Sequence, residues 1–364
     1  MRDQPGDARA GAPDPAPVTT AMPPSAPAGS ASRASSHTAS AASSQSTTRI
    51  EAHSAARTTA RTTTRRSLAI GLACALGGAV CFSAKAIFVK LIYSYGMDVT
   101  TTFALRMMIA LPFFIALGLW TGTSGLSKIA RRDWLGMVGC GILGFYLSSY
   151  FDFIGLSYIP ASLERLILFL YPTFVVLLSW LVFRTRLTGV QGISLALSYS
   201  GVLLVVWQSL HVVGDGSALA IGVAFTLASA FTYACYVVVS ASIIPRVGSM
   251  RFTSYASSVA CGFSIAHFLI ARDVEALIAP PIVYLYAFGM STLSTVLPVL
   301  LVAEALRRLG ANQVAIVSSI GPIATLAMAA AILGETISLL QMVGAGLVIG
   351  GVLLVSLRAP RAVG

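Results

Sequence analysis

Ten long apolar segments constrain what this chain can fold into more than any other feature. Each has about the 20 residues that an α-helix needs to cross roughly 30 Å of hydrocarbon. Hydrophobic residues make up 56% of the chain and charged residues only 10%, which excludes an ordinary soluble domain. The sequence therefore predicts an all-α membrane protein with ten transmembrane helices. The predicted spans are residues 68–92, 99–120, 134–157, 161–183, 188–208, 217–241, 252–271, 281–304, 311–333 and 338–357.

The second half of the chain repeats the first at an offset of 150 residues. Pro172 recurs as Pro322, and the run Gly201–Val205 recurs as Gly351–Val355. Each copy holds five predicted spans, and five is an odd number, so the second copy must cross the membrane in the opposite sense. Two inverted repeats of this kind are typical of secondary transporters. The repeats are predicted over residues 67–210 and 216–358.

Residues 1–66 differ in composition from the rest of the chain. They are mostly Ala, Ser, Thr, Pro and Arg, with almost no large apolar side chains. Such a segment cannot bury enough surface to offset its chain entropy, which predicts a disordered tail. Its scarcity of acidic residues also resembles an organellar transit peptide. A plain disordered extension is the alternative interpretation, and the composition favours it.

The formal net charge of +11 does not indicate nucleic-acid binding, because the cations are scattered and form no basic helix face. They indicate membrane orientation instead, because cytoplasmic loops carry an excess of Lys and Arg. With both termini cytoplasmic, only Arg272 lies on the outer side, and outer loops hold acids such as Asp98 and Glu335. The cytoplasmic cations are then Arg61, Arg65, Arg66, Lys128, Arg131, Arg132, Arg184, Arg186, Arg246, Arg251, Arg307, Arg308, Arg358 and Arg361.

Several kinds of enzyme and metal protein find no support in the sequence. The five cysteines all lie in apolar segments without CxxC spacing, so neither a disulfide framework nor a metal site is predicted. The chain has no HExxH, GxSxG or P-loop sequence. We therefore expect no cofactor, no catalytic residue and no ATP-driven cycle.

The ends of the two copies carry a characteristic pattern. The second copy has Gly321-Pro322, Ile332-Leu333-Gly334-Glu335 and the Gly-rich helix that ends in Gly351–Val355. The first copy has Leu170-Tyr171-Pro172 and Leu105-Arg106. This pattern resembles the EamA family of the drug/metabolite transporter superfamily. The resemblance covers about residues 67–358 and implies a transporter of small metabolites. One departure is that the first copy has Arg184-Thr185-Arg186 where the second has Gly334-Glu335.

Charged residues inside the predicted spans are candidates for a transport site, because a charge in hydrocarbon costs about 3 kcal/mol and normally faces a cavity or a partner. The candidates in the outer half of the first copy carry four positive and two negative charges, which suggests an outward-facing polar vestibule for an anionic or carboxylate-bearing group. Alternatives are a static Arg106–Asp152 pair, a Glu164 that complements the positive end of its helix, and an Arg165 that extends to the interface. These candidates are Lys85, Lys90, Arg106, Asp152, Glu164 and Arg165. His267 and Glu304 lie near helix ends and are predicted to be interfacial.

Pro172 and Pro322 form a second indication, since each lies about 12 residues into its span, near the bilayer midplane. Proline removes a backbone hydrogen bond, and paired helix interruptions often mark a central binding site. A packing kink is the alternative. Tyr171 lies beside the first proline and offers an aromatic and hydroxyl contact.

These patterns predict a secondary active transporter in the bacterial inner membrane, with an organellar membrane as the alternative. Its expected partners are a small-molecule solute and the lipid bilayer, and the oligomeric state is open between monomer and homodimer. Asp152 and Glu164 are the acids placed to exchange a proton near a solute. A receptor or scaffold without transport, an ion channel and an intramembrane enzyme are the competing classes.

Overall fold

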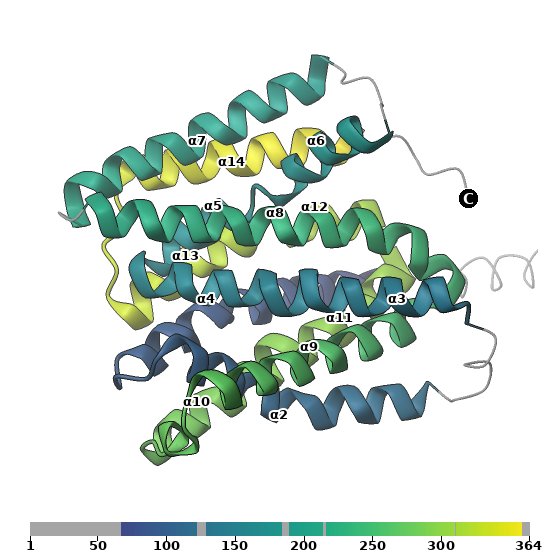
Figure 1. The fold of residues 1–364 in the computed structure, drawn as a ribbon. Coiled ribbons are helices and arrows are strands. Elements are labelled where there is room, and N and C mark those ends of the chain that lie inside the picture. Colours follow the sequence, from purple (N-terminus) through teal and green to yellow (C-terminus); the bar gives the residue numbers. More distant parts are fainter. Residues whose placement is uncertain (1–66, 122–128, 184–188, 214–215, 310, 359–364) are drawn as a thin grey trace, which may run out of the picture. The chain divides into compact units, whose positions relative to one another are not determined.

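The computed structural model describes residues 67–121, 129–183, 189–213, 216–309 and 311–358. Each predicted span is helical (Figure 1). The first repeat contains a helix at Ser67–Tyr93, α2 (Val99–Trp120), α3 (Arg131–Cys140), η2 (Gly141–Leu147), α4 (Ser148–Tyr158), α5 (Ala161–Leu168), α6 (Tyr171–Phe183) and α7 (Gly189–Val213). The second contains α8 (Gly216–Val247), α9 (Ser249–Ala271), η3 (Val274–Leu277), α10 (Pro281–Ser291), η4 (Thr292–Val296), α11 (Leu297–Leu309), α12 (Ala311–Ser318), α13 (Gly321–Leu333) and α14 (Leu339–Arg358).

The predicted all-α membrane fold is confirmed. Nine helical segments in the described part of the chain are long and apolar enough to cross a membrane, and α14 adds a shorter apolar helix at Leu339–Leu354. The third and eighth spans run unbroken through several element labels, whereas the fourth and ninth are each divided in two. Five crossings separate the start of the first repeat from the start of the second, so the repeats are inverted.

The bundle has two ends, which we name by the residues found there. The terminal end is the one where the described chain begins, at Ser67, and ends, at Arg358. The Glu335 end is the opposite one, where the chain passes from α13 to α14. Described arginines gather at the terminal end, and Arg246 there donates to Asp133 at 2.6 Å. The predicted disordered tail, Lys128, the Arg184-Thr185-Arg186 loop and Arg361 lie outside the described residues.

Short capping contacts explain where the helices begin and end. Asp98 caps α2, because one of its carboxylate oxygens accepts the N–H groups of Thr100 at 2.9 Å and Thr101 at 3.2 Å. At the other end of the chain, Gly334 closes α13 with a left-handed φ of 68°. A residue with a Cβ is strained in that conformation, so glycine is the residue that allows the chain to turn there.

Replacing Asp98 by Ala is expected to lower the free energy of unfolding by about 1 kcal/mol at pH 7, the usual value of an N-cap. Burial raises the pKa of Asp98, but the hydrogen bonds from Thr101 and Thr100 and the nearby charge of Arg272 outweigh it and lower the pKa below its ordinary value. A lowered pKa means that the carboxylate stabilises the fold above about pH 4. That contribution is lost as the pH falls through the folded-state pKa.

Thermal unfolding of the detergent-solubilised protein at pH 7 and pH 3 checks this prediction. The gap between wild type and Asp98→Ala should shrink at pH 3. Asp98→Asn is the matched control, because an Asn side chain still caps a helix but does not titrate. A gap that is equal at both pH values would contradict an ionised cap.

The third span of each repeat contains a π-helical turn. The first, η2, covers Gly141–Leu147, and the second, η4, covers Thr292–Val296. Shifted by the 150-residue offset of the repeat, η2 would occupy positions 291–297, which include η4. Such turns are rare and frequently found at functional sites. Both copies therefore share a local irregularity that the apolar pattern of the sequence did not predict.

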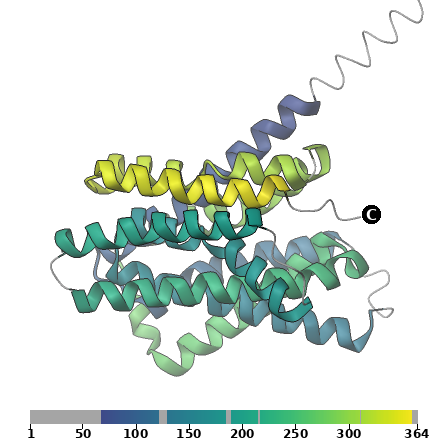
Figure 2. The ribbon, with the colours of Figure 1, turned by 90° about the horizontal axis from the view of Figure 1, so that it is seen from above.

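The last helices of the two repeats, α7 and α14, pack side by side (Figures 1 and 2). Their backbones approach closely because glycines face each other, and a Cβ added at Gly201 would lie 2.7 Å from the carbonyl oxygen of Gly344. Small residues at helix contacts are the usual means of close packing in membranes. This pair joins the two repeats at their C-terminal helices.

Candidate functional site

The fourth and ninth spans are both interrupted at matching positions. Span four breaks at Phe169–Leu170, between α5 and α6, and span nine breaks at Ser319–Ile320, between α12 and α13. Pro172 and Pro322 stand in the first turns of the helices that resume. The predicted paired interruptions are thus confirmed. The role of these prolines in solute binding stays a prediction.

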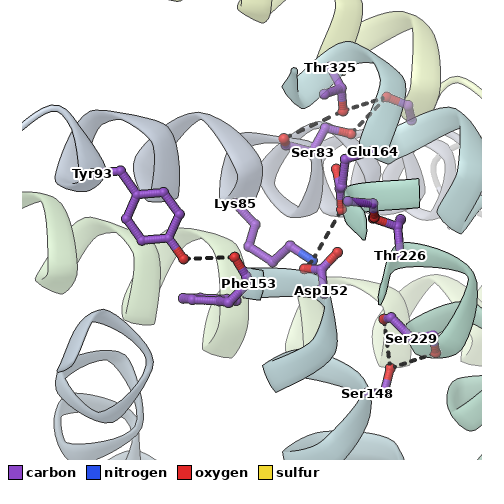
Figure 3. Close-up of polar contacts among 12 residues, drawn as sticks. Ser83, Lys85, Tyr93, Ser148, Asp152, Phe153, Glu164, Thr226, Ser229 and Thr325 are labelled. Atoms are coloured by element: carbon purple, nitrogen blue, oxygen red, sulfur yellow. Dashed lines mark hydrogen bonds and ion pairs between the residues drawn. The ribbon is translucent and has the colours of Figure 1, made fainter. Parts of the chain in front are cut away.

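Three charged side chains from three different spans meet beside these breaks (Figure 3). The Lys85 ammonium donates to Asp152 Oδ2 at 2.5 Å and lies 3.8 Å from Glu164 Oε1. The side chains of Lys85, Asp152 and Glu164 are 8%, 2% and 0% exposed. One ammonium thus lies close to two buried carboxyl groups. Asp152 Oδ1 and both oxygens of Glu164 accept no hydrogen bond from the described residues.

Arg165 reaches from α5 to the break in the ninth span. A Cβ built on Gly321 would lie 3.0 Å from Arg165 Nη2, so a larger residue at that break would press on the guanidinium. Arg165 also lies over the ring of Phe82, 4.9 Å from its centroid, and Lys85 lies 5.6 Å from the same centroid. Arg165 Nε is buried and has no hydrogen-bond partner among the described groups.

Ser83 connects the first helix to the same break. Its hydroxyl donates to the carbonyl oxygen of Gly321 at 2.9 Å. Thr325 donates to that carbonyl as well, at 3.2 Å, and lies beside Ser83 in Figure 3. Gly321 is the first residue of α13, so the Ser83 hydroxyl joins the first helix to the start of the helix that resumes after the break, close to Arg165.

Arg106 lies apart from the ion pair, although it comes from the same half of the first repeat. Its Nε donates to Thr295 Oγ1 at 3.1 Å, and its guanidinium lies 5.5 Å from the centroid of Phe153. Thr295 belongs to η4 and bonds back to the carbonyl of Met290, five residues earlier. The π-helical turn of the second repeat thus presents the hydroxyl that holds Arg106. Nη1 of Arg106 is buried without a partner among the described residues.

Three interpretations of these charges do not match the structure. Asp152 pairs with Lys85 rather than with Arg106, because Arg106 turns towards η4. Arg165 does not extend to the interface, since it is only 8% exposed. Glu164 does lie in the first turn of its helix, where it also faces Lys85, and Glu335 caps the N–H groups of that turn. The charges do not line an open outward vestibule here, because Lys85, Asp152 and Glu164 are all buried.

The remaining candidates have simpler surroundings. Tyr171 is half-buried and its ring makes an edge contact with Tyr233, with 5.1 Å between centroids. Lys90 is half-buried. Glu304 is bound by Arg307 and Arg308 at the helix surface, in keeping with an interfacial position. A hydrogen bond of 2.9 Å joins Nδ1 of His267 to the hydroxyl of Tyr146, which belongs to η2.

No metal centre is found in the part of the chain that the structure describes. There, no three His, Cys, Asp or Glu side chains are grouped so that they could hold an ion. All five cysteines are free. The polar chemistry of the site therefore comes from the ion-pair cluster, the two arginines and the hydroxyl groups around the breaks.

Packing of the described side chains differs between the two ends. Towards the Glu335 end, two clusters of buried residues are present. One joins the first helix, α2, α4, α5, α9, α10 and α13, with Phe103 and Met290 among its members, and the other joins α5, α7, α8, α13 and α14 around Leu166. Two smaller clusters lie towards the terminal end. One joins α3, α8 and α9 around Met137, and the other joins the first helix, α11 and α12 around Ala75. The larger clusters of buried residues thus lie towards the Glu335 end.

Sequence reasoning missed several residues of this site. Phe82, Ser83, Thr295 and Thr325 are uncharged, so a search for charges in spans does not find them. Glu335 was noted only as part of a motif, because its partners lie far away in the sequence. The repeat offset places Gly141 and Gly144 at Ser291 and Ser294, so the matching π-helical turns give no common residue by which a sequence comparison could find them.

Two inverted five-helix repeats, matched broken helices and buried charges beside the breaks are found together in many membrane transporters. The comparison with known families agrees and is more specific. The chain belongs to the EamA-like transporter family, whose model matches residues 69–207 and again residues 220–357.

Relatives of known sequence point the same way. The chain is 30% identical over 289 residues to a Bacillus subtilis protein named "Uncharacterized transporter YcbK", covering 76% of this chain and 90% of that protein. It is 28% identical over 228 residues to a "Probable amino-acid metabolite efflux pump" of Salmonella typhimurium, covering 59% of this chain and 74% of that one. These names point to a transporter and away from an enzyme. The protein is a multi-pass membrane transporter of small metabolites.

A solved crystal structure shares the fold. It covers 82% of this chain and 99% of its own, with a TM-score of 0.56 and 17% sequence identity. At that identity the likeness concerns the fold alone.

Proposed function

We propose that this protein is a secondary active transporter of a small, carboxylate-bearing solute of the amino-acid type, coupled to protons and working by alternating access. We place it in the bacterial plasma membrane with both termini in the cytoplasm. The observation that carries the proposal is the buried group of charges at the two broken helices, with Lys85, Asp152 and Glu164 at its centre.

The charge balance supports a carboxylate as the bound group. The buried charges of the site are Lys85, Arg106 and Arg165 with two acids, Asp152 and Glu164, while a further buried acid, Asp133, pairs with Arg246. One positive charge is therefore in excess at the site when all are ionised. An unbalanced charge inside the membrane is costly, and a carboxylate on the solute would remove that cost. The free Nε of Arg165, beside the break at Gly321, offers such a group a charge-assisted hydrogen bond.

The same cluster supports proton coupling. With one ammonium between two carboxyl groups, the trio of Lys85, Asp152 and Glu164 is electrically neutral only when it also holds one proton. Arg165 lies over the ring of Phe82, as Lys85 does, and Arg106 is a further buried charge, over the ring of Phe153. A solute carboxylate that binds the arginines and a proton that binds the acids would both change the charge balance of the cluster. Each binding event would then affect the other, which is the basis of coupled transport.

The two terminal-end packing clusters suggest which parts move. Each cluster combines helices of both repeats: α3 with α8 and α9 in one, and the first helix with α11 and α12 in the other. We therefore infer that the moving units combine helices from the two repeats, rather than one whole repeat rocking against the other. The two clusters are separate at the terminal end, while one of the clusters at the Glu335 end contains helices of both units. We infer that this arrangement is the state of the cycle that is open towards the terminal end.

Counterflow in proteoliposomes tests the proposed function. Purified protein should exchange radiolabelled L-amino acids, offered as a mixture and then singly, at a rate that depends on an imposed pH gradient. Asp152→Asn should retain solute exchange but lose its dependence on the pH gradient. If Asp152→Asn kept the full pH dependence, the assignment of Asp152 as the proton carrier would fail. If no solute crossed under any ion gradient, a receptor or scaffold would become the better interpretation.

A further inference from the structure

Glu335 of the second repeat caps a helix of the first. Its Oε1 accepts the N–H of Ala161 at 2.8 Å, and its Oε2 accepts the N–H of Ser162 at 3.1 Å and the Ser162 hydroxyl at 2.6 Å. These are the first two residues of α5, whose own N-cap residue, Pro160, supplies no side-chain hydrogen bond. The cap of α5 therefore comes from a residue 174 positions away in the chain.

The local structure holds Glu335 in this place. Gly334 ends α13 with its left-handed φ of 68°. The N–H of Glu335 then donates to the carbonyl of Ala329 at 3.2 Å. The turn thus connects the carboxylate to the end of α13, which begins at the break beside Gly321. Through Glu335, the broken ninth span is joined to the broken fourth span at the Glu335 end.

The helix that Glu335 caps carries part of the site. α5 has only eight residues between its capped start and the break at Phe169. Glu164, which faces Lys85, and Arg165, which faces Gly321, both belong to it. A carboxylate at a helix N-terminus is stabilised by the free N–H groups and by the helix dipole. A shift of α5 away from Glu335 would displace both charged side chains.

Building on the proposed function, we propose that Glu335 is a positioning residue. It holds α5, and with it Glu164 and Arg165, in the state closed at the Glu335 end. This contact must break for that end to open. Comparison of the two repeats supports a role for such a contact at the Glu335 end only. The residue at the corresponding place in the first copy is Thr185, which lies outside the described residues and carries no charge. A carboxylate cap would then bias the protein towards the state closed at the Glu335 end.

Hydrogen exchange of the full-length protein in lipid nanodiscs, measured by mass spectrometry without solute, tests this proposal. Glu335→Ala should speed exchange of the α5 amides about fivefold, the factor expected for the loss of a helix cap. It should also slow exchange at the terminal end, in the segments around Met137 and Ala75, because the population moves towards the state closed there. Glu335→Gln keeps one acceptor oxygen and should lie between Glu335→Ala and the wild type.

The control is Glu275→Gln, which removes an exposed carboxylate from the same end without touching α5. It should leave both regions unchanged. Faster exchange in α5 without slower exchange at the terminal end would make Glu335 a helix cap only, and unchanged exchange in α5 would refute the contact itself. Neither result depends on transport. Absence of L-amino acid counterflow in the wild type would refute the proposed function separately.

Discussion

Lys85→Met is expected to reduce counterflow to the level of empty liposomes and to lower the free energy of unfolding by about 3–5 kcal/mol, the usual cost of breaking a buried ion pair. The substitution leaves Asp152 and Glu164 as two buried carboxyl groups without their ammonium. Methionine fills nearly the same volume, so the effect comes from the lost charge. Flux in proteoliposomes and thermal unfolding in detergent measure the two effects.

A double variant separates stability from function. Lys85→Met together with Asp152→Asn removes one charge of each sign and leaves Glu164 as the only carboxyl group of the trio. We expect it to recover most of the stability but none of the transport. If Lys85→Met alone transported at the wild-type rate, the cluster would be a structural pair and the transport site would have to lie elsewhere.

Gly351→Leu is expected to destabilise the protein by about 3 kcal/mol, at the upper end of the range for overpacked sites. A Cβ at Gly351 would lie 2.2 Å from Ser198 Oγ and 2.8 Å from the carbonyl oxygen of Ser194. A backbone carbonyl cannot rotate away as a flexible side chain can. α7 and α14 would therefore have to separate, and the contact that joins the two repeats at their last helices would weaken.

Gly346→Leu is the matched control on the same helix. A Cβ at Gly346 meets nothing within 4 Å, so leucine there should change the stability by less than about 0.5 kcal/mol. Thermal unfolding of both variants in the same detergent makes the comparison. Equal losses of stability for the two variants would mean that replacing any glycine in α14 destabilises the protein, whether or not that glycine contacts α7.

The fold could be predicted because its signals are local. A run of apolar residues marks a span wherever it lies, and a proline in mid-span marks an interruption, which is why the breaks near Pro172 and Pro322 could be foreseen. The site could be predicted only in part, because its pairings are long-range. The sequence suggested Arg106 as a partner for Asp152, and only the packing of the spans places Lys85 beside it.

Neutral groups were the larger omission. The hydroxyl of Thr295 holds Arg106 from the other repeat, and neither its charge nor its position in an apolar run distinguishes it. Glu335 was visible as an acid in an outer loop, but its partners are backbone N–H groups, which every residue has. A sequence shows which residues can donate or accept, and the fold determines which of them meet.

The matching π-helical turns bear on the history of the chain. A π-helical turn holds one more residue than an α-helical turn, so it records a single added residue in a helix. η2 and η4 lie at corresponding positions in the third spans of the two copies. We infer that the residue was added once, before the five-span unit was duplicated, and was inherited by both halves.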